Sequence, residues 1–105
     1  MNFSGKTAVV TGGSRGIGRA ICLKLAAGGA HVVLCYAGNE DAARETAAEC
    51  EKLGAKALAV RCNVADSAQV QVLMDTAVKT FGGIHILINN AGITRDQLMM
   101  MMKEE

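Results

Sequence analysis

A glycine-rich segment directly after a short apolar run constrains this chain more than any other feature. Residues 7–11 form a β-branched run, and the segment Gly12-Gly13-Ser14-Arg15-Gly16-Ile17-Gly18 follows it and opens a helical pattern. A strand, a turn and a helix in this order bring free backbone N–H groups and the positive end of a helix dipole to one point. The segment therefore predicts an anion-binding turn.

The spacing of the glycines indicates which anion. Gly12 allows a sharp turn, Gly16 allows the backbone to approach a pyrophosphate, and Gly18 allows the helix to pack close to the strand. A second apolar run begins about 20 residues later, which is the context expected of a dinucleotide-binding unit. The alternative, a tight strand–helix turn with no ligand, stays open but is less favoured.

The rest of the chain alternates between two hydrophobic periods. Apolar runs at residues 7–11, 32–36, 57–60 and 84–88 suit parallel strands that are buried on both faces. Helical stripes lie between them, at Ile17, Ala20, Ile21 and Leu25, at Ala43, Thr46, Ala47 and Cys50, and at Val70, Leu73, Met74, Ala77, Val78 and Phe81. Asp66 and Gln69 resemble a capping box before the last stripe.

This alternation predicts an α/β fold of the Rossmann type with three layers. Right-handed crossovers and the usual winding of dinucleotide folds give a parallel sheet of four strands in the order 3-2-1-4, which is the truncated half of a larger sheet. We expect residues 1–105 to form a single unit, the N-terminal portion of a dinucleotide-binding domain.

Charge and composition argue against several other classes of protein. The formal net charge of +1 favours neither a nucleic-acid nor a membrane-surface partner. No apolar run approaches the roughly 20 residues that span a bilayer. The four cysteines form no Cys-x-x-Cys pair, and each falls in an apolar stretch, so we expect buried thiols in a cytoplasmic protein.

The end of the second apolar run indicates which dinucleotide binds. NAD-preferring enzymes place an acid there to bind the ribose hydroxyls, but this run ends in Tyr36, Ala37 and Gly38. Arg15 in the glycine turn offers a fixed charge for a 2′-phosphate. We therefore expect NADP(H). A solvated loop cation at Arg15 and ordinary packing of Tyr36 are the alternatives.

Two motifs together resemble the short-chain dehydrogenase/reductase family. The first is Thr-Gly-x-x-x-Gly-x-Gly at residues 11–18, and the second is Asn89-Asn90-Ala91-Gly92 after the fourth run. Within the family, residues 93–96 and 102–105 resemble the bacterial 3-oxoacyl-acyl-carrier-protein reductases of fatty acid biosynthesis. The resemblance runs along the whole chain but covers less than half of such an enzyme.

The resemblance implies the residues of an NADP(H) site. Those in and after the first two runs are Gly12, Gly13, Ser14, Arg15, Gly16, Ile17, Gly18 and Tyr36. The Asn63 side chain and the Val64 backbone would read the adenine edge, and Asn90, Ala91, Gly92 and Ile93 would flank the ribose and nicotinamide. Asn89 has the alternative role of tying adjacent strands together.

The resemblance also implies a catalytic set that this sequence lacks. Family members use a Tyr, a Lys four residues later, a Ser and an Asn. The only tyrosine here is Tyr36, and Glu40 stands four residues after it. We expect these positions beyond Glu105, so the chain is interpreted as the NADP-binding part of an NADPH-dependent oxidoreductase, inactive alone. The alternative is a nucleotide-binding or self-associating module without catalysis.

Other candidate sites are weaker. His31 and His85 are interpreted as entry residues of the second and fourth strands. Neither has a partner at metal-ligand spacing, so no metal is expected. In the complete enzyme the partners would be NADPH and 3-oxoacyl-acyl-carrier-protein.

The run at residues 84–88 has no lysine or proline to protect it as a sheet edge, and residues 99–102 add apolar surface. We therefore expect a homo-oligomer.

Overall fold

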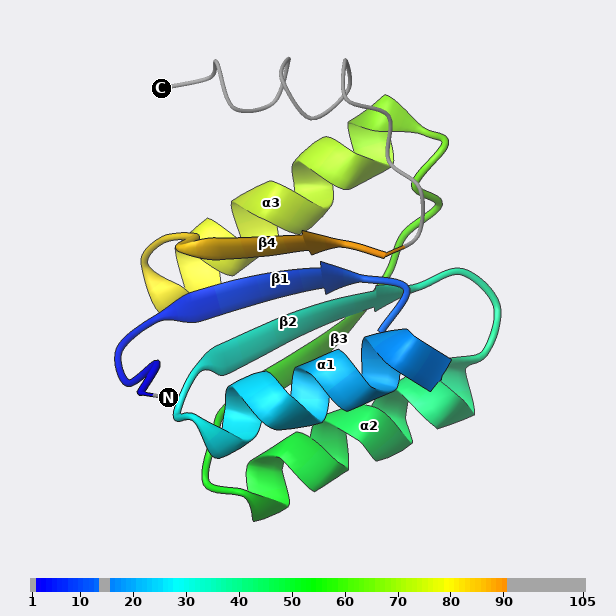
Figure 1. Ribbon diagram of the computed structural model, residues 1–105. Coiled ribbons are helices and arrows are strands. Elements are labelled where there is room, and N and C mark those ends of the chain that lie inside the picture. Colours follow the sequence, from blue (N-terminus) through cyan, green and yellow to red (C-terminus); the bar gives the residue numbers. More distant parts are fainter. Residues whose placement is uncertain (1, 14–15, 91–105) are drawn as a thin grey trace.

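The computed structural model describes residues 2–13 and 16–90 and contains seven alternating strands and helices (Figure 1). In chain order they are β1 Thr7–Thr11, α1 Gly16–Ala27, β2 His31–Tyr36, α2 Glu40–Lys52, β3 Ala57–Arg61, α3 Ser67–Phe81 and β4 Ile86–Asn89. The predicted alternation of strand and helix is confirmed.

The strands form one parallel sheet in the order β3-β2-β1-β4, which confirms the predicted topology. In the centre of the sheet, Val9 lies opposite both Val33 and Leu87. The predicted run at residues 84–88 differs from the strand, because β4 begins at Ile86 and extends to Asn89. His85 precedes it and is held at the entrance of β1, since its N–H donates to the Thr7 carbonyl over 2.9 Å.

Two apolar cores sandwich the sheet, because side chains alternate between its faces along each strand. On the face covered by α1 and α2, the core is built by Ala8, Val10, Val32 and Leu34 with Cys22, Leu25, Ala43 and Cys50. On the face covered by α3, it is built by Val9, Val33 and Cys35 with Val70, Leu73 and Ala77. Figure 1 shows this division, with α1 and α2 on one side of the sheet and α3 on the other.

The predicted helical stripe of α1 is confirmed at Ile21 and Leu25, which pack in the core, and is wrong at Ile17 and Ala20, which are exposed. Ile17 is 73% exposed, and the buried side of α1 carries Gly18, Cys22, Leu25 and Ala26. The reason is that Gly18 must lie against the glycine turn, which rotates Ile17 into solvent. The stripes of α2 and α3 are confirmed, except that Val78 is 48% exposed.

Only one half of the predicted capping box forms at the start of α3. The Asp66 carboxylate accepts the N–H groups of Ala68 and Gln69, as a cap should. The Gln69 side chain does not return to the Asp66 N–H. Its Oε1 atom instead accepts the backbone N–H of Asn63 over 2.9 Å. The helix start thus holds the loop that leaves β3.

Candidate functional site

The candidate site lies at the carboxyl ends of the strands, which we call the carboxyl edge of the sheet. Because all pairings are parallel, the glycine turn after β1, residues 37–39 after β2, the loop after β3 and Asn90 after β4 all leave this edge. In Figure 1 the arrowheads of β1, β2 and β4 point towards it, and α1 begins beside it. Ligands of open α/β sheets bind outside this edge.

Two glycines of the turn have the backbone conformation that the sequence predicts. Gly12 and Gly16 have φ angles of +69° and +63°, which side chains rarely adopt. A Cβ atom at Gly16 would meet no heavy atom within 4 Å, so the space directly beside Gly16 is open. Gly12 and Gly16 thus have the backbone that a pyrophosphate cradle needs, and α1, a helix of twelve residues, begins at Gly16. Binding of a pyrophosphate at this helix N-terminus stays a prediction.

Gly18 and Gly13 are needed for packing rather than for backbone freedom. A Cβ atom at Gly18 would overlap the Gly12 carbonyl oxygen and lie 2.8 Å from the Asn90 Nδ2 atom. At Gly13 it would lie 2.8 Å from the Leu34 Cβ atom and 2.9 Å from the Cys22 sulfur. Gly18 thus packs closely, as predicted, although against the turn itself. The close packing of Gly13 was not predicted, since its neighbours are distant in sequence.

Asn90 joins the end of β4 to the glycine turn. Its backbone N–H donates to the Thr11 hydroxyl over 2.9 Å, and its side-chain Nδ2 donates to the Gly12 carbonyl over 3.2 Å. The Thr11 hydroxyl also lies 3.4 Å from the Asn89 Oδ1 atom. The alternative role of Asn89, to tie adjacent strands together, therefore applies at least equally to Asn90. The predicted contacts of Ser14, Arg15 and residues 91–93 lie outside the described residues.

The end of β2 carries no carboxylate in the structure. Tyr36 is half-buried against the core on the α1–α2 side, and residues 37–39 are exposed. The Asn39 side chain caps α2 by accepting the Ala42 N–H over 3.0 Å. Glu40, the first acid after the strand, forms an ion pair with Arg44. The ribose position expected beside β2 is thus free of the acid that would repel a 2′-phosphate.

The loop after β3 is already shaped by its own polar groups. The Asn63 Oδ1 atom accepts the Ala65 N–H over 3.0 Å, while the side chain remains exposed at the carboxyl edge. Val64 is half-buried and packs against the α3-side core. The two residues are therefore held in place beside the edge, where their predicted adenine contacts stay a prediction.

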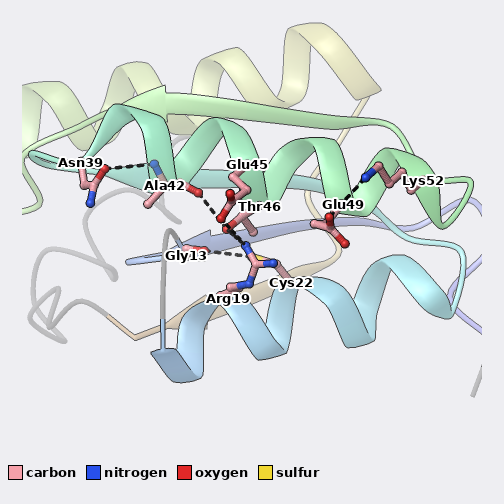
Figure 2. A network of polar contacts seen from close by, with 9 residues as sticks. All are labelled: Gly13, Arg19, Cys22, Asn39, Ala42, Glu45, Thr46, Glu49 and Lys52. Carbon is pink, nitrogen blue, oxygen red and sulfur yellow. Dashed lines mark hydrogen bonds and ion pairs between the residues drawn. The ribbon is translucent and has the colours of Figure 1, made fainter.

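The sequence patterns did not predict the polar network that lies behind the turn (Figure 2). Arg19 reaches from α1 to α2, where its Nη1 atom donates to the Thr46 hydroxyl over 3.2 Å and lies 3.6 Å from a Glu45 carboxylate oxygen. The Cys22 thiol donates to the Gly13 carbonyl over 4.0 Å. The feature of the sequence that could have indicated this network is the cation directly after the last glycine of the turn. The network braces α1 against α2.

All four cysteines are free and buried, as predicted. Burial raises the pKa of the Cys22 thiol to about 12 and that of Cys62 to about 11. Burial also raises the pKa of Cys35 and Cys50. The thiols therefore stay protonated at neutral pH and act as small apolar side chains, not as nucleophiles.

The two histidines have structural partners. His31 stacks on the Phe81 ring with centroids 5.0 Å apart, and the His85 Nδ1 atom accepts the Thr7 N–H over 3.0 Å. Within residues 2–13 and 16–90, no group of three or more metal-ligating side chains could hold an ion. In the same part of the chain, no helix has the length and apolarity needed to cross a membrane.

The short chain dehydrogenase family matches residues 6–105 of this chain. Among curated proteins, the 3-oxoacyl-acyl-carrier-protein reductase of Escherichia coli is 47% identical over 105 residues, and that of Staphylococcus aureus is 46% identical over 100 residues. The matches cover 100% and 95% of this chain, respectively, but only 41% of each relative. The chain thus spans about two fifths of the length of these relatives.

Solved structures agree with the fold. A short chain dehydrogenase from Burkholderia cenocepacia in complex with NADP has a TM-score of 0.85 and 45% identity, covering 90% of this chain and 39% of its own. A blue fluorescent protein from a metagenomic library in complex with NADPH has a TM-score of 0.84 and 42% identity, covering 89% of this chain and 38% of its own.

Proposed function

The chain belongs to the short-chain dehydrogenase family, and from that premise we propose that it is the NADP(H)-binding part of an NADPH-dependent 3-oxoacyl-acyl-carrier-protein reductase. The glycine turn carries this proposal. Gly12 and Gly16 have the positive φ angles that the turn needs, Gly18 packs closely against the Gly12 carbonyl, and the space directly beside Gly16 is open. The reductases among its relatives support the substrate class.

The charges at the carboxyl edge support NADP(H) rather than NAD(H) as the cofactor. Residues 36–39 contain no acid, and the nearest one, Glu40, is paired with Arg44. Arg15 lies in the glycine turn and can fork onto a phosphate. Two of the similar solved structures hold NADP or NADPH.

The described residues would bind and orient the cofactor. The N-terminus of α1 would hold the pyrophosphate, and the Asn90 bond to the Gly12 carbonyl would keep the turn in its binding shape. Asn63 and Val64 would contact the adenine. Bound NADPH supplies a hydride from its nicotinamide, on the side that residues 91–93 would flank.

Arg15→Ala tests the cofactor assignment. We expect the variant to lose about tenfold or more of its NADPH affinity, because a charged hydrogen bond to phosphate contributes about 1.5–3 kcal/mol. NADH affinity should change by less than about twofold, since NADH lacks the 2′-phosphate. Fluorescence titration of the purified chain with each cofactor measures both effects. An equal loss for the two cofactors would contradict the role of Arg15.

The second candidate function is a nucleotide-binding or self-associating module without catalysis. The positive φ angles of Gly12 and Gly16 and the close packing of Gly18 favour retained nucleotide binding, whatever the catalytic state. In either case we propose the cytoplasm as the location, because four free thiols suit a reducing compartment. In the complete enzyme, 3-oxoacyl-acyl-carrier-protein would be the second partner.

We also propose that the chain associates with a second copy through β4. In the described sheet β4 pairs only with β1, and Ile86, Leu87 and Ile88 are half-buried with no charged residue among them. An unpaired apolar edge is a template for another strand. Sedimentation at micromolar concentration should show dimers or larger species. A monodisperse monomer would rule out this association.

A further inference from the structure

We propose that Arg61 is a specificity-determining residue that binds the adenosine 2′-phosphate of NADP(H). The inference rests on the proposed function, because it assumes that a dinucleotide occupies the carboxyl edge. It adds a cation from β3 to a site that the sequence motifs place only in the glycine turn.

The strand register places Arg61 beside the ribose position. Arg61 is the last residue of β3 and pairs with Tyr36, the last residue of β2. In NAD enzymes the acid that binds the ribose 2′-hydroxyl stands at the end of the second strand. Neighbouring strands are about 4.8 Å apart, so a long arginine side chain on β3 can reach a group above the end of β2.

Strand alternation directs Arg61 to the side of the sheet where α2 begins. Ala57 and Ala59, four and two residues before it, pack with Tyr36 against the α1–α2 side core. Arg61 shares their face because side chains alternate along a strand. Residues 37–39, which lead from β2 into α2, leave the carboxyl edge next to it. The side chain of Arg61 is exposed there and can meet a ligand in solvent.

The charges around this position leave Arg61 available for an anion. Arg19 is engaged with Glu45 and Thr46, and Arg44 is paired with Glu40. Arg61 makes no ion pair within residues 2–13 and 16–90. Its guanidinium offers donors in a planar fork that matches two phosphate oxygens. A phosphate on the ribose would thus find a cation at the end of β3.

The test compares nucleotides that differ in the 2′-phosphate. Calorimetric titrations compare the chain of unchanged sequence with its Arg61→Met and Arg61→Lys variants. Each protein is titrated with NADPH, NADH, adenosine 2′,5′-bisphosphate and adenosine 5′-monophosphate. The matched control is Lys56→Met. Lys56 is an exposed cation directly before β3, about 16 Å from Arg61 along the strand, and its loss changes the net charge equally.

We expect Arg61→Met to weaken binding of NADPH and of the bisphosphate by about tenfold, as the loss of one charged hydrogen bond implies. NADH and the monophosphate should bind within about twofold of the unchanged chain. Lys56→Met should leave all four affinities unchanged, and Arg61→Lys should restore part of the lost affinity. Because Arg61 is exposed, its variants should keep the melting temperature, which separates a binding defect from unfolding.

The outcomes separate this inference from the proposed function. If the unchanged chain prefers NADPH but Arg61→Met affects no nucleotide, or all four equally, the role of Arg61 is wrong while the proposed function stands. If the unchanged chain binds none of the four nucleotides, the proposed function fails and the inference fails with it.

Discussion

Gly18→Ala is expected to destabilise the fold by about 3 kcal/mol and to abolish nucleotide binding. The added methyl group would overlap the Gly12 carbonyl oxygen and press on the Asn90 side chain at 2.8 Å. Neither neighbour can withdraw freely, because the Asn90 amide is hydrogen-bonded to that carbonyl over 3.2 Å. Overpacking against a held backbone costs about 1–3 kcal/mol and sometimes more. Urea unfolding followed by circular dichroism measures the loss.

Gly38→Ala is the matched control for this prediction. A Cβ atom at Gly38 would meet nothing within 4 Å, and its φ angle is not positive. We expect a change of less than about 0.5 kcal/mol, as for ordinary surface positions. Gly16→Ala should fall between the two, at about 1 kcal/mol, because its site is open but its φ is +63°. Equal stability of the Gly18 and Gly38 variants would contradict the packing role of Gly18.

Residues 1–105 on their own are expected to show no measurable reduction of a 3-oxoacyl thioester by NADPH. Carbonyl reduction needs a positioned acid to protonate the developing alkoxide, and general acid catalysis contributes about 10²–10⁴-fold. The single tyrosine, Tyr36, has Glu40 rather than a lysine four residues later. The Cys22 and Cys62 thiols, with pKa values raised to about 12 and 11, are buried and cannot replace it.

The measurement follows NADPH absorbance with a 3-oxoacyl thioester and the purified chain at micromolar concentration. A full-length reductase in the same assay serves as the positive control. Turnover that co-purifies with the chain, and is unaffected by rigorous removal of host reductases, would show that an acid outside the expected family set acts here. Such turnover would favour a complete enzyme over a binding module.

Local patterns were sufficient to predict the order and kind of the elements. The boundaries of β1 were predicted to the residue, and those of β2 and β3 to within one residue, since continuous apolar runs suit strands buried on both faces. At β4 the apolar run was misleading. Ile84 packs against the core without joining the strand, and His85 holds the entrance of β1 instead.

The site was predicted less completely than the fold. The roles of Gly12 and Gly16 follow from backbone freedom within one short turn, so a sequence motif can express them. The packing of Gly13 depends on Leu34 and Cys22, which only β2 and α1 bring together. The exposure of Ile17 likewise depends on how Gly18 seats α1 against the turn. The hydrophobic period of a single helix or strand carries no information about such contacts between distant residues.

By itself, the sequence determined the alternating α/β order, the glycines with positive φ in the turn after β1 and the absence of an acid at the end of β2, because each is a property of neighbouring residues. Tertiary structure alone decided that Asn90 fastens the turn through Gly12 and that Arg61 stands opposite Tyr36. Those pairs are 78 and 25 residues apart along the chain. Only the parallel register of the sheet brings them within a side chain's reach, since hydrogen bonding between strands sets which distant residues become neighbours.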